Sequence, residues 1–275
     1  MPIRILAVLT ETQTARACLE GALAAAAVEA DVQIEALHVR VDPDKLLRAS
    51  EELAFQRFRE RYEGTVQDRA NSIRGVFEAW VAGLPVSMAA RVRWREDVGA
   101  EQDKVIEEAC KADLLVLARP HNVDGGDAMH AAVFEVHRPL MVPPDWAIGP
   151  DHGFDGHLVI AWNGTRQAKD AVEGAAPWLR RAARVTLVMI ANDERAGGRD
   201  EAEHLLHEIG VTAEILLVAP VGREPAEQIL RIAHDQKADA LVMGAYRHND
   251  MIEWALGGTT RQVLARAQIP LFLAH

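Results

Sequence analysis

Two glycines and two threonines near the C-terminus have the residue types that a phosphate-binding turn requires. Gly257 and Gly258 precede Thr259 and Thr260, and an apolar run that ends on Gly244 lies upstream. Backbone N–H groups reach a phosphate only where the chain approaches closely, which glycine allows, and a helix N-terminus adds partial positive charge. An ordinary helix start with glycine at its cap has the same spacing, so both interpretations stay open on spacing alone.

Arg247 lies in the loop between that apolar run and the glycine pair. Its guanidinium carries a fork of donors that matches phosphate oxygens. The same side chain is also large enough to fill the pocket. The two roles predict opposite effects of an Arg247→Gly variant. If Arg247 fills the pocket, the variant should bind phosphate more tightly, and if Arg247 contacts phosphate, the variant should bind it more weakly.

Other kinds of catalytic chemistry lack their residues. A Walker loop needs a lysine next to its second glycine, and no lysine lies near these glycines. A serine nucleophile is excluded from the second half, because all serines precede residue 90. His204 and His207 have a spacing that can bind zinc, although solvated histidines on a helix face are commoner. No carboxylate or histidine has a clear role as a base, so we expect any hydrolysis to be slow.

The composition excludes several partners. The net charge is -11 and no stripe of lysine and arginine is visible, which argues against nucleic acid and against an anionic membrane surface. No apolar stretch approaches the roughly 20 residues of a membrane helix, and the N-terminus lacks the pattern of a signal peptide. Cys18 and Cys110 are far apart in sequence, which fits a reducing compartment. We therefore expect a cytoplasmic protein.

Strand-like apolar runs alternate with helical patterns in both halves. We expect strands at 3–9, 32–39, 85–94, 113–118 and 139–142, and again at 157–162, 184–190, 212–219, 238–244 and 269–274. Residues 44–81 are expected to form a long helical region, and residues 127–137 a short helix. Strands that are joined through helices form parallel sheets, and apolar strands form sheets that are covered on both faces. The sequence predicts two Rossmann-like α/β domains, each a five-stranded parallel sheet with helices on both faces.

The two halves also align with each other. "EACKADLLVLARP" in the first half matches "AHDQKADALVMGAY" in the second, and "AAVFEVHRPLMV" matches "RQVLARAQIPLFL". The segment 143–156 is rich in proline, glycine and aspartate and is predicted to be the linker. The domains are therefore expected at 1–144 and 156–275.

On these residues the chain resembles the universal stress protein family in a tandem two-domain form. Gly244, position 247 and Gly257 keep the spacing of that family's G-x2-G-x9-G-(S/T) motif. The resemblance implies an adenine nucleotide, ATP above all, with Mg²⁺ as its companion ion. It implies a binding site at Ala161, Trp162, Asn163, Ile190, Met243, Gly244, Arg247, Gly257, Gly258, Thr259 and Thr260.

The chain departs from the family pattern at several positions. Arg247 replaces the second glycine of the motif, and Asn163 replaces an acidic residue at the end of the first strand. In the first half, Thr10 stands where an aspartate is expected, Ala118 replaces the leading glycine, and the following loop is shorter. We expect the first half to have lost its nucleotide site and to serve as a pseudo-symmetric partner.

The predicted assembly is an internal pseudo-dimer that pairs the fifth strands of the two domains, with a homodimer left open. Pairing would cover two strand edges that otherwise invite association. The leading function is a stress-response or regulatory protein that binds an adenine nucleotide in its second domain. The alternative is an interaction or scaffold protein in which Arg247 closes the pocket.

Overall fold

The computed structural model describes residues 3–29, 31–41, 64–119, 126–146, 148, 153–193, 198–222, 224–245 and 258–274. In the first half the elements are β1 (Ile3–Val8), α1 (Thr12–Ala26), β2 (Val32–Val41), α3 (Val66–Ala82), α4 (Val86–Ala89), β3 (Val92–Gly99), α5 (Glu101–Ala109), β4 (Leu114–Leu117), α6 (Gly126–His130), the π-helix η1 (Ala131–Glu135) and β5 (Leu140–Val142). In the second half they are β6 (His157–Trp162), α7 (Arg166–Gly174), α8 (Ala176–Leu179), β7 (Arg184–Ile190), α10 (Arg199–Glu208), β8 (Glu214–Val218), α11 (Pro225–Asp235), β9 (Ala240–Gly244), α13 (Thr259–Arg266) and β10 (Leu271–Ala274).

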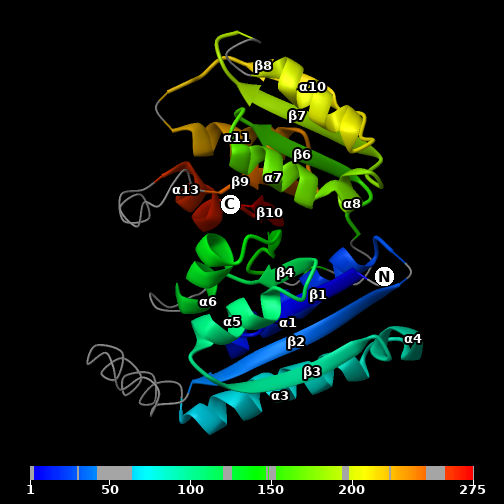
Figure 1. Ribbon diagram of the computed structural model, residues 1–275, viewed down its shortest axis with the longest axis vertical. Coiled ribbons are helices and arrows are strands. Elements are labelled where there is room, and N and C mark those ends of the chain that lie inside the picture. The colour runs from blue at the N-terminus through cyan, green and yellow to red at the C-terminus, as the bar shows by residue number, and fades with distance from the viewer. Residues whose placement is uncertain are drawn as a thin grey trace.

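The strands form one continuous sheet in the order β3-β2-β1-β4-β5-β10-β9-β6-β7-β8 (Figure 1). Within each half all the pairs are parallel. The two halves meet where β5 and β10 pair antiparallel. The predicted α/β class and the pairing of the fifth strands are therefore confirmed, and the two five-stranded sheets merge into one sheet of ten strands.

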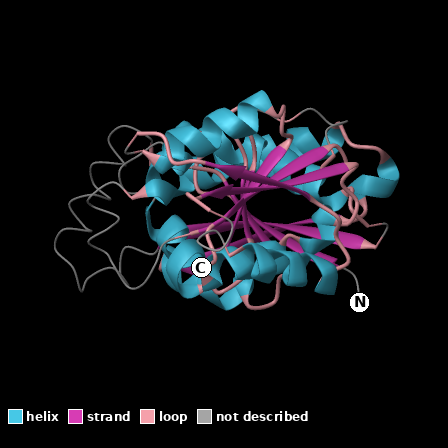
Figure 2. Cartoon of the chain, turned by 90° about the horizontal axis from the view of Figure 1, so that it is seen from above, coloured by secondary structure: helices cyan, strands magenta, loops and turns pink. Residues whose placement is uncertain are grey.

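Helices cover both faces of the sheet (Figure 2). Side chains of α1, α3, α7, α8 and α10 build one hydrophobic cluster, and side chains of α5, α6, η1, α11 and α13 build the other. The inner strands are apolar on both faces for this reason, and all four residues of β4 are buried.

The junction between the halves is a packed core. Phe272 of β10 lies opposite Met141 of β5, and its ring centroid is 5.1 Å from that of Phe154 and 5.0 Å from that of Trp178. The indole N–H of Trp178 donates to the carbonyl of Ala25 in α1, over 3.0 Å. Aromatic packing of this kind is specific in geometry as well as apolar. The halves are thus joined by side chains from both sides of the seam.

Two expectations for the first half are wrong in detail. Residues 85–94 were expected to form one strand, but the chain forms the short helix α4 first and β3 begins only at Val92. Pro85 directly precedes that helix, a position that suits its fixed φ angle. The expected helix at 127–137 is α-helical only as far as His130 and then widens into the π-helix η1. Residues 44–63 of the expected long helical region lie outside the described residues.

No helix among the described residues is long and apolar enough to cross a membrane.

Candidate functional site

The carboxyl ends of β6 and β9 mark the point where the strand order of the second half reverses. The two strands are neighbours, with Ala161 of β6 opposite Met243 of β9. The helix after β6, α7, packs on one face of the sheet, and the helix after β9, α13, packs on the other. Crevices at such switch points are where open α/β sheets bind their ligands.

Helix α13 begins at this edge without a capping side chain. Its N-cap is Gly258, in an extended conformation (φ -57°, ψ 162°), and the cap makes no side-chain hydrogen bond. Thr259 and Thr260 form the first turn, and Thr260 is buried. A helix start whose cap supplies no acceptor presents its backbone N–H groups and positive dipole end to an anion.

Helix α7, at the end of β6, begins in a different way. The hydroxyl of Thr165 accepts from the backbone N–H of Ala168 over 3.3 Å, as an N-cap does. The amide oxygen of Asn163 accepts from the backbone N–H and the hydroxyl of Thr165, at 3.2 and 2.7 Å. The N-cap of α7 is therefore Thr165. Asn163 holds the cap in place, and its oxygen is already used.

Gly244 is explained by the packing of α7. A Cβ atom at this position would lie 2.6 Å from the backbone nitrogen of Ala168 and 2.7 Å from the carbonyl carbon of Gln167. Both atoms belong to backbone, which cannot move aside cheaply. The absence of a side chain therefore lets the first turn of α7 sit directly on the end of β9. Sequence reasoning gave Gly244 a role toward phosphate and assigned no role to Gln167.

The predicted site residues divide between the two faces of the sheet. Trp162 lies on the α7 face, where its ring is 3% exposed and its indole N–H donates to the carbonyl of Gly198 over 3.3 Å. Ala161, Ile190 and Met243 belong to the opposite face, with the side chains of α11 and α13. The structure therefore brings Ala161, Ile190 and Met243 to the α13 side of the switch point, whereas the ring of Trp162 is core.

Two predicted site residues, Arg247 and Gly257, lie outside the described residues. The same holds for Gly125 of the first half. Among the described residues no group of three or more histidine, cysteine, aspartate or glutamate side chains is arranged to hold a metal ion.

The first half has the same topology with different residues at the equivalent edge. Ala118 follows β4 where Gly244 ends β9, as the strand registers show. Arg119 comes next, in the position of Ala245. Its guanidinium donates to the carbonyls of Leu264 and Ala267 at the end of α13, at 2.5 and 3.1 Å. Sequence reasoning missed Arg119, and its only signal was an arginine directly after a buried strand.

A mostly parallel, doubly wound sheet with helices on both faces defines a Rossmann-like α/β protein. Residues 156–275 match the model of the universal stress protein family. That segment therefore belongs to the universal stress protein family, which confirms the resemblance.

Individual proteins are similar over different parts of the chain. A universal stress protein from Archaeoglobus fulgidus DSM 4304 is similar in structure, with a TM-score of 0.62 and 14% sequence identity. The similarity covers 98% of this chain and 95% of that protein. A universal stress protein that was solved in complex with cAMP matches 44% of this chain and 96% of that protein, with a TM-score of 0.37 and 21% sequence identity. A curated relative, an FMN-dependent NADH:quinone oxidoreductase from Thiobacillus denitrificans (strain ATCC 25259 / T1), is 29% identical over 146 residues, which are 51% of this chain and 71% of that protein. The match to the Archaeoglobus protein shows that the fold extends over both halves.

Proposed function

We propose that the second half binds an adenine nucleotide, ATP above all, at the carboxyl ends of β6 and β9. The role that fits is a stress-response or regulatory one in the cytoplasm, with at most slow hydrolysis. The observation that carries the proposal is the start of α13 at Gly258, where the cap supplies no side-chain acceptor and the helix lies at the switch point of the sheet. The phosphates would take the place of the missing cap.

Neighbouring residues fit a nucleotide in this position. Thr259 and Thr260 bring hydroxyl groups into the first turn of α13. Ala161 and Ile190 are half-buried apolar side chains on the same face of the sheet, at the ends of β6 and β7. An apolar wall beside a few polar groups is the usual composition of a small-molecule site. The base would lie against these side chains while the phosphates face α13.

The test is calorimetric titration of the nucleotide-stripped protein with ATP and Mg²⁺. We expect one site per chain. Gly258→Asp should lower the affinity at least about tenfold, or 1.4 kcal/mol. Aspartate is a good N-cap and suits the extended conformation of Gly258, so the helix is retained while a carboxylate occupies the phosphate position.

Gly258→Asn is the matched control for that variant. Asparagine caps a helix as well as aspartate does but brings no charge. We expect it to weaken binding less than Gly258→Asp, and equal affinity of all three proteins would contradict the site. Saturable binding that does not respond to either variant would place the nucleotide elsewhere.

The alternative function is an interaction or scaffold protein with a closed pocket. Arg247→Gly separates the two functions in the same titration. A gain of ATP binding on this change would support Arg247 as a plug, and a loss would support Arg247 as a phosphate ligand. Absence of binding by both the unaltered chain and the variant would favour the scaffold function.

A further inference from the structure

Arg119 of the first half holds the C-terminal end of α13 in the second half. One terminal nitrogen of its guanidinium donates to the carbonyl of Leu264, and the other donates to the carbonyl of Ala267. The last carbonyls of a helix have no partner within the helix, and a cation there also interacts favourably with the helix dipole. One side chain thus caps the helix across the seam between the halves.

The guanidinium is itself held in place. Asp145 pairs with it through two contacts of 3.1 Å, from Nε and from the second terminal nitrogen. The Arg119 side chain is 13% exposed and that of Asp145 is 52% exposed, so the carbonyl bonds are shielded from water while the carboxylate is half in solvent. Arginine suits such a place because its donors are fixed in one plane. The contact is therefore directional.

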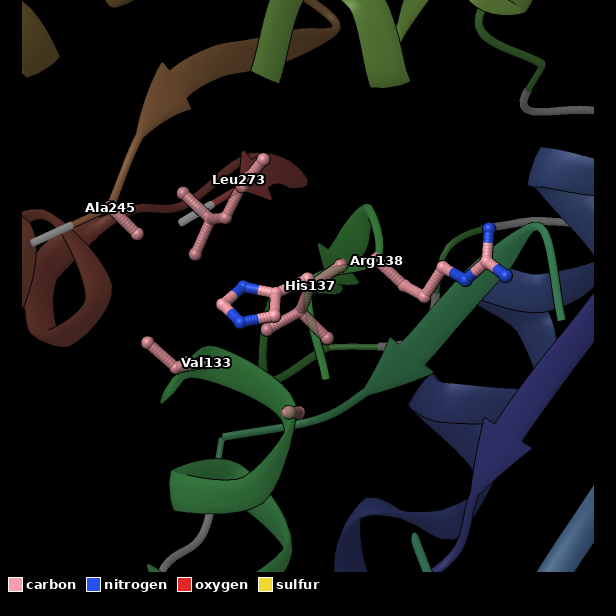
Figure 3. Close-up of a pocket in the computed structure, with 8 residues that line it drawn as sticks. Val133, His137, Arg138, Ala245 and Leu273 are labelled. Carbon is pink, nitrogen blue, oxygen red and sulfur yellow. The ribbon is translucent and has the colours of Figure 1, made fainter. Parts of the chain in front are cut away.

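The equivalent place on the other side of the seam carries a methyl group instead of a guanidinium. Ala245 has the position of Arg119, and its methyl group lies with Val133, His137 and Leu273 around a shallow pocket (Figure 3). Val133 is the counterpart of Leu264 in the register of the two halves. Arg138 extends away from this pocket in the same view. Among the residues that the structure describes, the clamp therefore runs from the first half to α13 and has no counterpart in the other direction.

Helix α13 transmits the position of its last turn to its first. It has eight residues, which is about 12 Å at 1.5 Å per residue. The helix also packs against α11, and its Arg266 forms an ion pair of 3.4 Å with Glu224. Side chains of Val263 and Ala267 seat it on the sheet. A helix this short moves as one body, so a loose C-terminal end displaces the N-terminal amides.

We propose that Arg119 is a positioning residue for the nucleotide site of the second half, so that the first half sets the affinity of a site to which it contributes no phosphate ligand. The inference rests on the proposed function. It assigns the first half a regulatory role: whatever displaces Arg119 at the end of β4 loosens α13 and weakens binding.

The test compares Arg119→Ala with Arg138→Ala. Arg138 makes the same kind of contact, a bond of 3.0 Å to the carbonyl of Cys110 at the end of α5, but it stays within the first half. We expect Arg119→Ala to weaken ATP binding about three- to tenfold in titration calorimetry, which corresponds to one or two lost hydrogen bonds. Arg138→Ala should bind as the unaltered chain does, and equal affinities of all three proteins would overturn the inference.

Hydrogen exchange of the nucleotide-free proteins gives a second readout. Arg119→Ala should raise exchange in the amides of α13 and leave those of α7 unchanged, whereas a general loss of stability would raise both. Arg119→Lys keeps the charge but loses the planar fork of donors. Its affinity for ATP should therefore lie between that of Arg119→Ala and that of the unaltered chain. If the unaltered chain binds no nucleotide, the proposed function fails, and the exchange result still decides whether Arg119 holds α13. Unchanged exchange in α13 would overturn the clamp itself.

Discussion

The ends of β4 and β9 occupy equivalent places in the two halves and are used in opposite ways. At β9 the residue pair is Gly244 and Ala245, and the helix that follows β6 packs directly on the glycine. At β4 the pair is Ala118 and Arg119, and the arginine reaches across the seam to α13. The two halves therefore share the same sheet but differ in the residues after the fourth strand. In the second half a glycine lets α7 approach closely, and in the first half an arginine supports α13 of the other half.

The largest expected difference between the two ends is their tolerance of a side chain. Gly244→Val should destabilise the protein by about 1–3 kcal/mol, because its Cβ would meet the backbone of Gln167 and Ala168. Urea unfolding measures this change. The reverse exchange at the first end, Ala118→Gly, should cost only about 0.5–1 kcal/mol. Similar costs for the two variants would show that α7 does not depend on the glycine.

A smaller difference is expected in the response to acid. His38 of β2 is buried, and burial lowers its pKa, although a bond of 2.8 Å to the carbonyl of Leu9 opposes this. Met189 has the equivalent place in β7. Because the unfolded chain takes up the proton more readily, His38 costs stability as the pH falls below about 6.5, with a slope of at most about 1.4 kcal/mol per pH unit.

In the His38→Met variant the free energy of unfolding should fall less between pH 7.5 and pH 5 than in the unaltered chain. Urea unfolding at several pH values measures this. The exposed His234 provides the control, because His234→Gln should leave the slope as it is in the unaltered chain. If the free energy of unfolding of His38→Met has the same slope against pH as that of the unaltered chain, His38 does not contribute to the loss of stability in acid.

The smallest effect is expected from restoring the missing clamp. Ala245→Arg places an arginine beside Val133 and His137, which line the shallow pocket in Figure 3. By analogy with Arg119 it should reach the last carbonyls of η1 and raise stability by about 0.5–1 kcal/mol. Thermal unfolding measures the gain. A lower unfolding temperature would mean that the two sides of the seam are not equivalent in shape.

The sequence was sufficient for the fold because most strands are apolar runs and each half repeats the same alternation. The family resemblance implied the pairing of β5 with β10, for which the short runs at 139–142 and 269–274 are the strands. The widening of the helix after His130 was not predictable, since nothing in the local residues distinguishes a π-helix from an α-helix there.

The site was predictable only in part. The uncapped start of α13 follows from Gly258, because glycine has no side chain with which to cap. The role of Gly244 toward α7 depends on how closely the helix approaches the strand, and the role of Arg119 depends on a contact 145 residues away. Neither distance is encoded in local spacing. Arg247 and Gly257, which lie outside the described residues, stay predictions.

The position of β10 in the sheet has a consequence for how the chain is made. Of the ten strands, β10 is synthesised last, yet it lies in the middle, between β5 and β9. Until it emerges, the nascent chain has two unpaired apolar strand edges, which attract other chains. A chaperone that covers β5 and β9 during translation would therefore matter most for this protein, and truncation before Leu271 should convert a folding chain into an aggregating one.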